Sequence, residues 1–392
     1  MKKIFFVAIA ATLLAAACQK TEVLNQVNPV DGTSMTFAPN MGKLTKAPTA
    51  EGQGTTNLSE QDFRLWAFYK ADDPQKGAYA NEVYDKMENI IISDGPEGSV
   101  GNEWKANKTH FWPGKGKFLK FFAISADSAT YGSEGSKTTT SEEGKTPSKV
   151  DVNAETNTMK VTGFTVDPAK PDTDLMVADY TEAKQKEADK GSNTVNFTFR
   201  HALTKVQFSF RNTETSMPVY VQQMYVEKIN TVADLTVNGA TDATTMTWGA
   251  ASAPALFAGD YVNAGATELE YEEAENIADW NNAVAINDAN YMELTGTYQP
   301  FTTWLVIPQN VFVAGETEPT TDLKVTIAYV IKSGEEYRQF VSTFSLGSAN
   351  VVPTWGQNQY VKYNINLTPN IIGFSATVAP WDETTGDTNI NE

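Results

Sequence analysis

The chain has 392 residues, of which 41% are hydrophobic and 11% aromatic, and it carries a formal net charge of −18 at pH 7. This length and composition exclude a disordered protein and are typical of a globular chain with material for two domains of roughly 150 to 200 residues each. The acidity argues against a nucleic-acid partner, because the phosphate backbone would repel it and no basic patch offsets the repulsion.

The N-terminus has the parts of an export signal. Two lysines precede an apolar run from Ile4 to Ala17, which as a helix is about 21 Å long and too short to cross the roughly 30 Å hydrocarbon core of a membrane. Three alanines then precede Cys18, the only cysteine of the chain. We therefore expect a signal peptide over residues 1–17. Its end resembles a bacterial lipobox, whose cysteine is lipidated and anchors the mature chain through several acyl chains.

A polar tether over residues 18–32 leads to a short predicted strand in the sequence SMTFAPN. Its apolar residues, Met35 and Phe37, alternate with polar ones and are expected to face inward. The Gly, Thr and Pro residues that follow are typical of a loop. We therefore expect this strand to be only weakly attached.

The rest of the first half alternates strong strand patterns with polar loops. One stretch, DFRLWAFYK, is apolar in both phases, which predicts a strand buried on both faces. Aromatic runs follow in FWPGKGKFLKFFAIS, and a hairpin is predicted in VDVNAETNTMKVTGFTV. The charged run TEAKQKEADKGSN lacks apolar periodicity, so we place a domain boundary there, with one domain at 33–190 and the other at 191–392.

The second half continues with strands and short turns. In VNFTFRHALTKVQFSF the apolar residues change phase between Leu203 and Val206, which predicts a bend or bulge. The strands on either side of KSGEE form a predicted hairpin with Gly334 at its tip. Strand-forming residues are dense and helical periodicity is absent, so the sequence predicts an all-β protein with two tandem β-sandwich domains.

The last regular stretch reads NIIGFSATVAPWDE and predicts a strand at 371–379 with one apolar face. That face consists of Ile372, Phe374, Ala376 and Val378. It has to be covered either by this chain or by another one.

Groups for catalysis or metal binding are few. Neither His110 nor His201 has a second histidine or cysteine at ligand spacing, and His201 is in phase with inward-facing phenylalanines, so a buried, hydrogen-bonded histidine is favoured. The sequence contains no nucleophile motif, phosphate-binding loop or calcium loop. We therefore expect no enzyme activity, no cofactor and no metal site.

Tryptophans offer a different kind of site, a flat platform for carbohydrate. Strand residues flank Trp66, Trp112 and Trp304, which favours positions in the core over such a platform. Trp381 follows Pro380 and is not explained by the strand pattern.

A family resemblance rests on motifs spread over the mature chain: the lipobox, LWAFYK, FWPGKGKFLKFFAIS, DLMVADY, FTFRHALTKVQF, WLVIPQ and IIGFSATVAPWDE. In their order and spacing they resemble the fimbrillin family, the Mfa-like subunits of type V pili. The resemblance implies two transthyretin-like β-sandwich domains. It also implies a lipoprotein of the outer membrane that is exposed at the cell surface as part of a fimbrium.

The resemblance further implies a structural subunit that polymerises by strand addition. In the family, a protease removes an N-terminal strand, and an extended segment of the next subunit, usually C-terminal, fills the groove. Carried over to this chain, the removed strand contains SMTFAPN. The donor strand is then 371–379, with Ile372, Phe374, Ala376 and Val378 entering the groove. The partners are copies of this chain or related fimbrial subunits.

One departure from the family leaves an alternative open. The family's protease typically cuts after arginine, but no arginine lies between Cys18 and Arg64. In this region Lys43 and Lys46 are the nearest basic residues in loop sequence and are the candidate cut sites. An uncut chain would stay anchored by its lipid as an anchor, tip or adhesin protein, with a host protein, a glycan or a bacterial surface molecule as its ligand.

Overall fold

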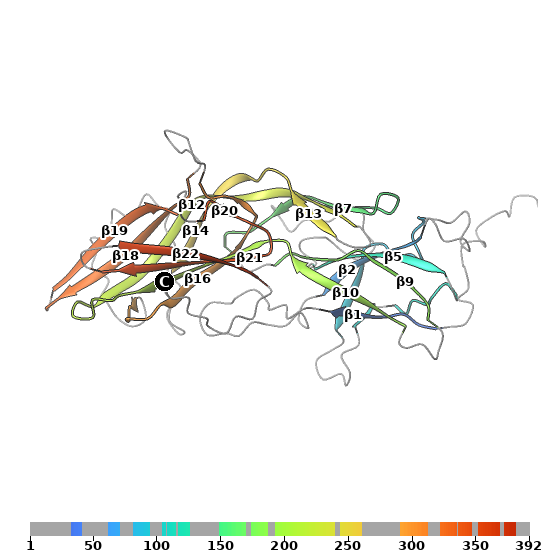
Figure 1. Ribbon diagram of the computed structural model, residues 1–392, viewed down its shortest axis with the longest axis horizontal. Coiled ribbons are helices and arrows are strands. Elements are labelled where there is room, and N and C mark those ends of the chain that lie inside the picture. Colours follow the sequence, from blue (N-terminus) through green and yellow to red (C-terminus); the bar gives the residue numbers. More distant parts are fainter. Residues whose placement is uncertain are drawn as a thin grey trace, which may run out of the picture.

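The structure is a computed structural model of the whole chain. It describes residues 33–40, 62–70, 81–94, 104–106, 108–114, 117–125, 149–169, 174–186, 193–239, 244–260, 291–312, 322–334, 336–346, 352–368 and 372–381. Over these ranges the chain forms strands and no helix, which confirms the all-β prediction. The strands make up four sheets in an elongated molecule (Figure 1).

The first sheet is closed on itself. Its strands follow the order β2 (Phe63–Tyr69), β3 (Ile90–Asp94), β4 (Trp104–Ala106), β1 (Thr36–Asn40), β10 (Thr194–His201), β8 (Met176–Ala178), β5 (Phe118–Ser125) and β9 (Thr181–Lys184). Because β2 also pairs with β5, the strands from β2 round to β5 form a closed ring, with β9 outside it. We call this sheet the ring; it occupies the end of the molecule opposite β18 and β19 (Figure 1).

Aromatic side chains fill the inside of the ring. Phe197 of β10 is fully buried and meets the rings of Phe37, Phe63, Phe121 and Phe199 at centroid distances of 6.4, 5.7, 6.1 and 6.3 Å. The sequence folds this way because alternate residues of each strand point to the same side of a sheet. We call this cluster the ring core.

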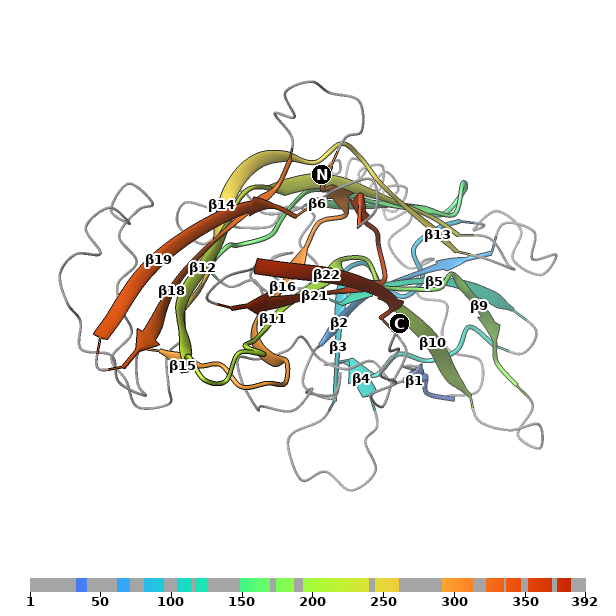
Figure 2. The same cartoon turned by 60° about the vertical axis from the view of Figure 1, so that its left-hand side comes forward.

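The second large sheet is built on one long strand, β12 (Val219–Asn238). The sheet order is β19 (Glu336–Ser345), β18 (Lys324–Ser333), β12, β7 (Thr158–Thr165) and β6 (Lys149–Asn153), and β12 also pairs with β13 (Thr245–Trp248), β14 (Ser252–Asp260) and β15 (Met292–Glu293). Figure 2 shows β12 curving from β15 at one end to β13 at the other. The predicted hairpin is present, because β18 and β19 pair on either side of Gly334, whose φ is 63°.

A third sheet packs against the β18 end of this long sheet. Its order is β16 (Gln299–Val306), β11 (Thr204–Arg211), β21 (Gln359–Leu367) and β22 (Ile372–Pro380). The remaining pair is β17 (Gln309–Asn310) with β20 (Thr354–Trp355). The facing sides of the long sheet and the third sheet bury Val, Ile, Leu and aromatic side chains in one cluster, which we call the main core.

The main core also reaches the outside of the ring. Trp66 of β2 and Phe122 of β5 belong to it, whereas their neighbours Leu65 and Phe121 belong to the ring core. This explains why β2 is buried on both faces, as predicted. Lys120 of β5 links the ring to the long sheet by hydrogen bonds. Its buried amine donates to a backbone oxygen and to an asparagine side chain of the β6–β7 turn, at 2.6 and 2.9 Å.

The sequence predicts a domain boundary between residues 190 and 191, but strands that precede this point pair with strands that follow it. β10 follows this point and completes the ring, while β6 and β7 precede it and pair, through β7, with β12. The division into 33–190 and 191–392 stays a prediction. The predicted change of phase corresponds to Ala202 and Leu203, just before the expected interval, where the chain leaves the ring for the sheet of β11.

Candidate functional site

The strand predicted to be removed, β1, is one of the strands that form the ring and lies between β4 and β10. It pairs in parallel with β10 along its whole length, and its other edge meets β4 through Phe37 and Trp104. Met35 and Phe37 are 5% and 4% exposed and belong to the ring core. Among the described strands, β1 alone closes the ring between β4 and β10.

Hydrogen bonds fix both the start and the body of β1. The Met35 amide donates to the His110 carbonyl at 2.8 Å, and the Trp112 amide donates to the Thr33 carbonyl at 3.0 Å. The hydroxyls of Thr36 and Thr194 lie 2.7 Å apart across the β1–β10 pair. The prediction of a weakly attached strand is wrong, because the short sequence gives no sign of the partners that lie far along the chain.

The predicted donor strand, β22, forms the edge of the third sheet. It pairs antiparallel with β21 from Ile372 opposite Leu367 to Pro380 opposite Gln359. Val378 lies opposite Val361, which is fully buried in the main core, so the two side chains share the inward face of the sheet. Ala376 packs against the main core, but Val378 remains 46% exposed.

These positions answer in part the question of what covers the apolar face of 371–379. The chain's own sheet covers Ala376 and leaves Val378 half open, since no further strand pairs with β22 in the described sheets. The backbones of Ile372 and Phe374 lie in β22. Their side chains are outside the described residues.

Trp381, unexplained by the sequence, anchors the end of β22. It is 4% exposed, and its ring lies parallel to that of His201 with centroids 3.6 Å apart and an interplanar angle of 5°. His201, 1% exposed, lies with Nδ1 2.7 Å from Oδ2 of Asp174. The Trp381 amide donates to the Asn358 carbonyl at 3.0 Å. His201 is the buried, hydrogen-bonded histidine that the sequence predicts.

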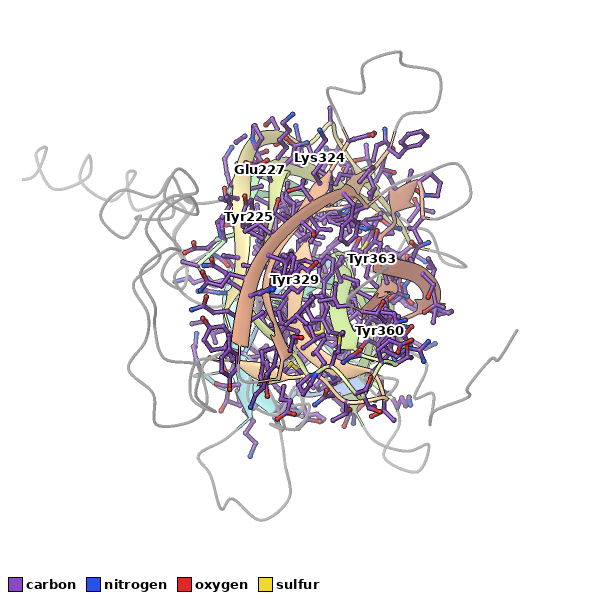
Figure 3. All side chains as sticks on the ribbon, turned by 90° about the vertical axis from the view of Figure 1, so that its left-hand side faces the viewer. Tyr225, Glu227, Lys324, Tyr329, Tyr360 and Tyr363 are labelled. Carbon is purple, nitrogen blue, oxygen red and sulfur yellow. The ribbon has the colours of Figure 1, made fainter. Side chains whose placement is uncertain are left out.

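The outer face of the third sheet carries a buried cation close to this anchor. Lys205 is 7% exposed, and its amine lies 4.5 Å from the centre of the Tyr360 ring; Lys362 contacts the same ring at 4.8 Å. Burial and the neighbouring Lys362 lower the pKa of Lys205 to about 8, and Asp174 acts in the opposite direction. Burial raises the pKa of Tyr360 to about 12. Figure 3 shows Tyr360 and Tyr363 on β21.

The other predicted residues fall into two groups. Cys18, Lys43 and Lys46 lie outside the described residues. The tryptophans expected in the core are there, because Trp66, Trp112 and Trp304 are at most 4% exposed.

The described part of the chain contains no group of three or more His, Cys, Asp or Glu side chains placed to hold a metal ion. No helix in the same ranges is long and apolar enough to cross a membrane.

Comparison with known proteins points to one family. A family model described as fimbrillin-like matches residues 45–381. A fimbrial protein from Bacteroides vulgatus is similar in structure, with a TM-score of 0.51 and 17% identity over 88% of this chain and 99% of that one. The tip fimbrial protein Mfa3 from Porphyromonas gingivalis gives a TM-score of 0.36 and 9% identity over 89% of this chain and 99% of that one. The comparison with curated proteins gives no match.

Proposed function

Because this chain belongs to the fimbrillin-like family, we propose that it is a structural subunit of a bacterial cell-surface fimbria. It is exported as an outer-membrane lipoprotein through Cys18 and polymerises by strand addition. A cut after Lys43 or Lys46 separates β1 from the rest of the chain. The observation that carries the proposal is the position of β1, which closes the ring between β4 and β10.

Loss of β1 produces a groove that fits an added strand. The edges of β4 and β10 lose their partner, and Trp104 and Phe197 lose the Phe37 side chain beside them. Unpaired backbone groups and exposed aromatic side chains both cost free energy, and a new strand offsets both costs. Strand addition of this kind obtains its affinity from main-chain hydrogen bonds and its specificity from alternate side chains.

The C-terminal strand is the donor, and its attachment favours head-to-tail assembly. β22 begins next to the end of β21, on the side of the molecule away from the ring, and runs back toward the ring. A strand that swings out about its first residues therefore extends beyond the end opposite β1. Such a contact joins unlike surfaces and does not close on itself, so it generates a filament.

The energy available to this contact is sufficient for a durable one. Ile372, Phe374 and Val378 each contribute about 1.5 to 3 kcal/mol on full burial, and the new ladder adds to this. While β22 is paired with β21 of its own chain, Val378 is still 46% exposed. Transfer to a neighbouring groove therefore buries apolar area that the chain's own sheet leaves open.

The experiment that tests the donor strand changes the charge of its two faces separately. Phe374→Asp with Val378→Asp is expected to abolish polymers, because two carboxylates cannot be buried unpaired in an apolar groove. The matched control is Ser375→Asp with Thr377→Asp, which places the same charge on the exposed opposite face of β22 and is expected to leave fibres intact. Fibres are counted by electron microscopy and folding is checked by circular dichroism. Normal fibres from the first variant would contradict the donor strand.

A second candidate is an uncut, lipid-anchored anchor, tip or adhesin protein that binds host or bacterial surface ligands. The firm seating of β1 and the absence of arginine between Cys18 and Arg64 favour it. Mass spectrometry of the N-terminus of the surface protein separates the two candidates. A start at Leu44 or Ala47 supports the polymerising subunit, and a lipidated start at Cys18 supports the anchored protein.

A further inference from the structure

We propose that Trp381 is the latch that holds β22 in the chain's own sheet, and that its seat on β10 links the release of β22 to the state of β1. The inference rests on the proposed function, in which β22 leaves β21 to join a neighbour. It deepens that function by naming what regulates the availability of the donor strand.

β22 is lightly packed, whereas the residue that follows it is well packed. Ser375, Thr377 and Val378 are exposed, and a side chain added at Gly373 would meet nothing within 4 Å. Trp381 is 4% exposed and its ring stacks on His201 at 3.6 Å. Among the described side chains from 373 to 381, Trp381 is the one that is buried. A large, well-packed aromatic residue surrounded by lightly packed ones carries most of the energy of a contact.

β22 can open from one end only. Its first residue follows closely on β21, so the Ile372 end stays near Leu367 whatever the rest of the strand does. Opening therefore starts at the other end, at Pro380 and Trp381. A strand that peels from one end breaks its hydrogen bonds one after another, so the contact at that end sets how often peeling begins.

The residue on which Trp381 stacks belongs to the strand that pairs with β1. His201 is the last residue of β10, and the same strand pairs with β1 through Thr194–Thr198. Asp174, which holds His201 at 2.7 Å, is itself buried beside β8, the other neighbour of β10 in the ring. Loss of β1 removes one of the two partners of β10. The strand that positions His201 then becomes looser, and the latch opens more often.

The latch is tested by hydrogen exchange on the full, monomeric chain. In Trp381→Ala the β22 amides that bond to β21 are expected to exchange about tenfold faster or more, because a buried aromatic contact is lost. Amides of β11 and β18 in the same molecule are expected to change much less. Trp381→Phe, which keeps a ring against His201, is expected to give an intermediate rate and covers the case in which the alanine variant fails to fold.

The matched control is Trp304→Phe, which makes the same change at a fully buried tryptophan of β16 that contacts Phe208 and Phe257. It is expected to speed exchange without preference for β22. Equal effects of the two phenylalanine variants on β22, relative to β11, would overturn the latch. Exchange is measured on monomers and does not depend on polymerisation. If Trp381→Ala speeds exchange selectively in β22 but the processed wild-type chain forms no polymers, the latch stands and the proposed function is contradicted.

The link to β1 is tested with a double-mutant cycle. Phe37→Ala loosens β1 in the intact chain and is expected to speed β22 exchange when Trp381 is present, but to add little in the Trp381→Ala background. The control is Met87→Ala, at a fully buried position of the ring core outside β1 and β10. Effects of Phe37→Ala that are the same in both backgrounds, or the same as those of Met87→Ala, would overturn the link.

Discussion

Lys205 shows how a single residue makes stability depend on pH. Its amine is buried beside Tyr360 and close to Lys362, and within the described residues it forms no ion pair. A charged group in such a place costs free energy that it does not cost in the unfolded chain. In the folded chain its pKa is lowered from 10.5 to about 8.

The sign of the effect follows from the two pKa values of Lys205. Below pH 8 the amine is charged in both states, and the folded state bears the full cost of burying it. Between about pH 8 and 10.5 the folded state loses its proton while the unfolded state keeps it, so this cost fades as pH rises. Lys205→Met is therefore expected to raise the free energy of unfolding by about 1 to 3 kcal/mol at pH 7, and by progressively less toward pH 10.5.

Urea denaturation of both proteins at several pH values measures this difference. The control is Lys362→Met, which removes the neighbouring charge and is expected to raise the pKa of Lys205, moving the window to higher pH. A stability gain from Lys205→Met that stays constant from pH 7 to 10.5 would contradict the assignment to an ionised amine.

At the scale of the element, β14 contains a local backbone strain next to a bulge. Ala253 has a φ of 57°, a left-handed conformation that costs a residue with a side chain about 1 to 2 kcal/mol. Its carbonyl accepts a hydrogen bond from the Thr231 hydroxyl at 2.8 Å, which fixes this geometry against β12. The pairing of β12 with β14 shifts register between Val226 and Ile229, close by.

Ala253→Gly is expected to stabilise the protein by up to about 1 kcal/mol, because glycine adopts this conformation without steric cost. The same substitution two residues later, Ala255→Gly, is expected to destabilise by about 0.5 to 1 kcal/mol, since Ala255 lacks a positive φ and packs against the main core. The midpoints of urea denaturation of the two variants are compared. If both variants lose stability to the same extent, the strain at Ala253 is absent.

The elements themselves were predictable from the sequence where the pattern is local. Alternation alone locates strands such as β10, β21 and β22, and the turn residues around Gly334 locate the β18–β19 hairpin. The partners were not predictable. β1 pairs with β10 about 160 positions away, and β7 pairs with β12 across a charged segment, and no local pattern encodes such contacts.

The candidate site was likewise predictable from the sequence only in part. The apolar residues of 371–379 and the burial of His201 follow from phase. The place of Trp381 does not, because its seat is formed by His201 and Asp174, which come from the ring. A tryptophan directly after a proline, outside any alternation, was the one available signal.

For the whole molecule, the net charge of −18 governs how subunits meet. Like-charged proteins repel one another over about 30 Å at 0.01 M salt and about 10 Å at 0.1 M. In the proposed function, assembly brings two such molecules end to end. We therefore expect polymerisation to become faster as sodium chloride is raised from about 0.01 to 0.1 M.

Light scattering of freshly processed subunits at the two salt concentrations measures the rate. Sucrose at matched viscosity is the control for effects other than screening. Slower assembly at the higher salt would mean that attraction between local opposite charges dominates the encounter, contrary to the effect of the net charge.

The long strand β12 has a mechanical consequence. It pairs at one end with β18 and at the other with β7. Hydrogen-bonded ladders therefore run over about 65 Å and join the β18 end of the long sheet to its β7 end. Tension along the strand loads such ladders in shear, and many hydrogen bonds must then break together. β22 is held differently, since a pull on its free end breaks its bonds singly. The same chain therefore combines a strand suited to bearing load with one suited to changing partners.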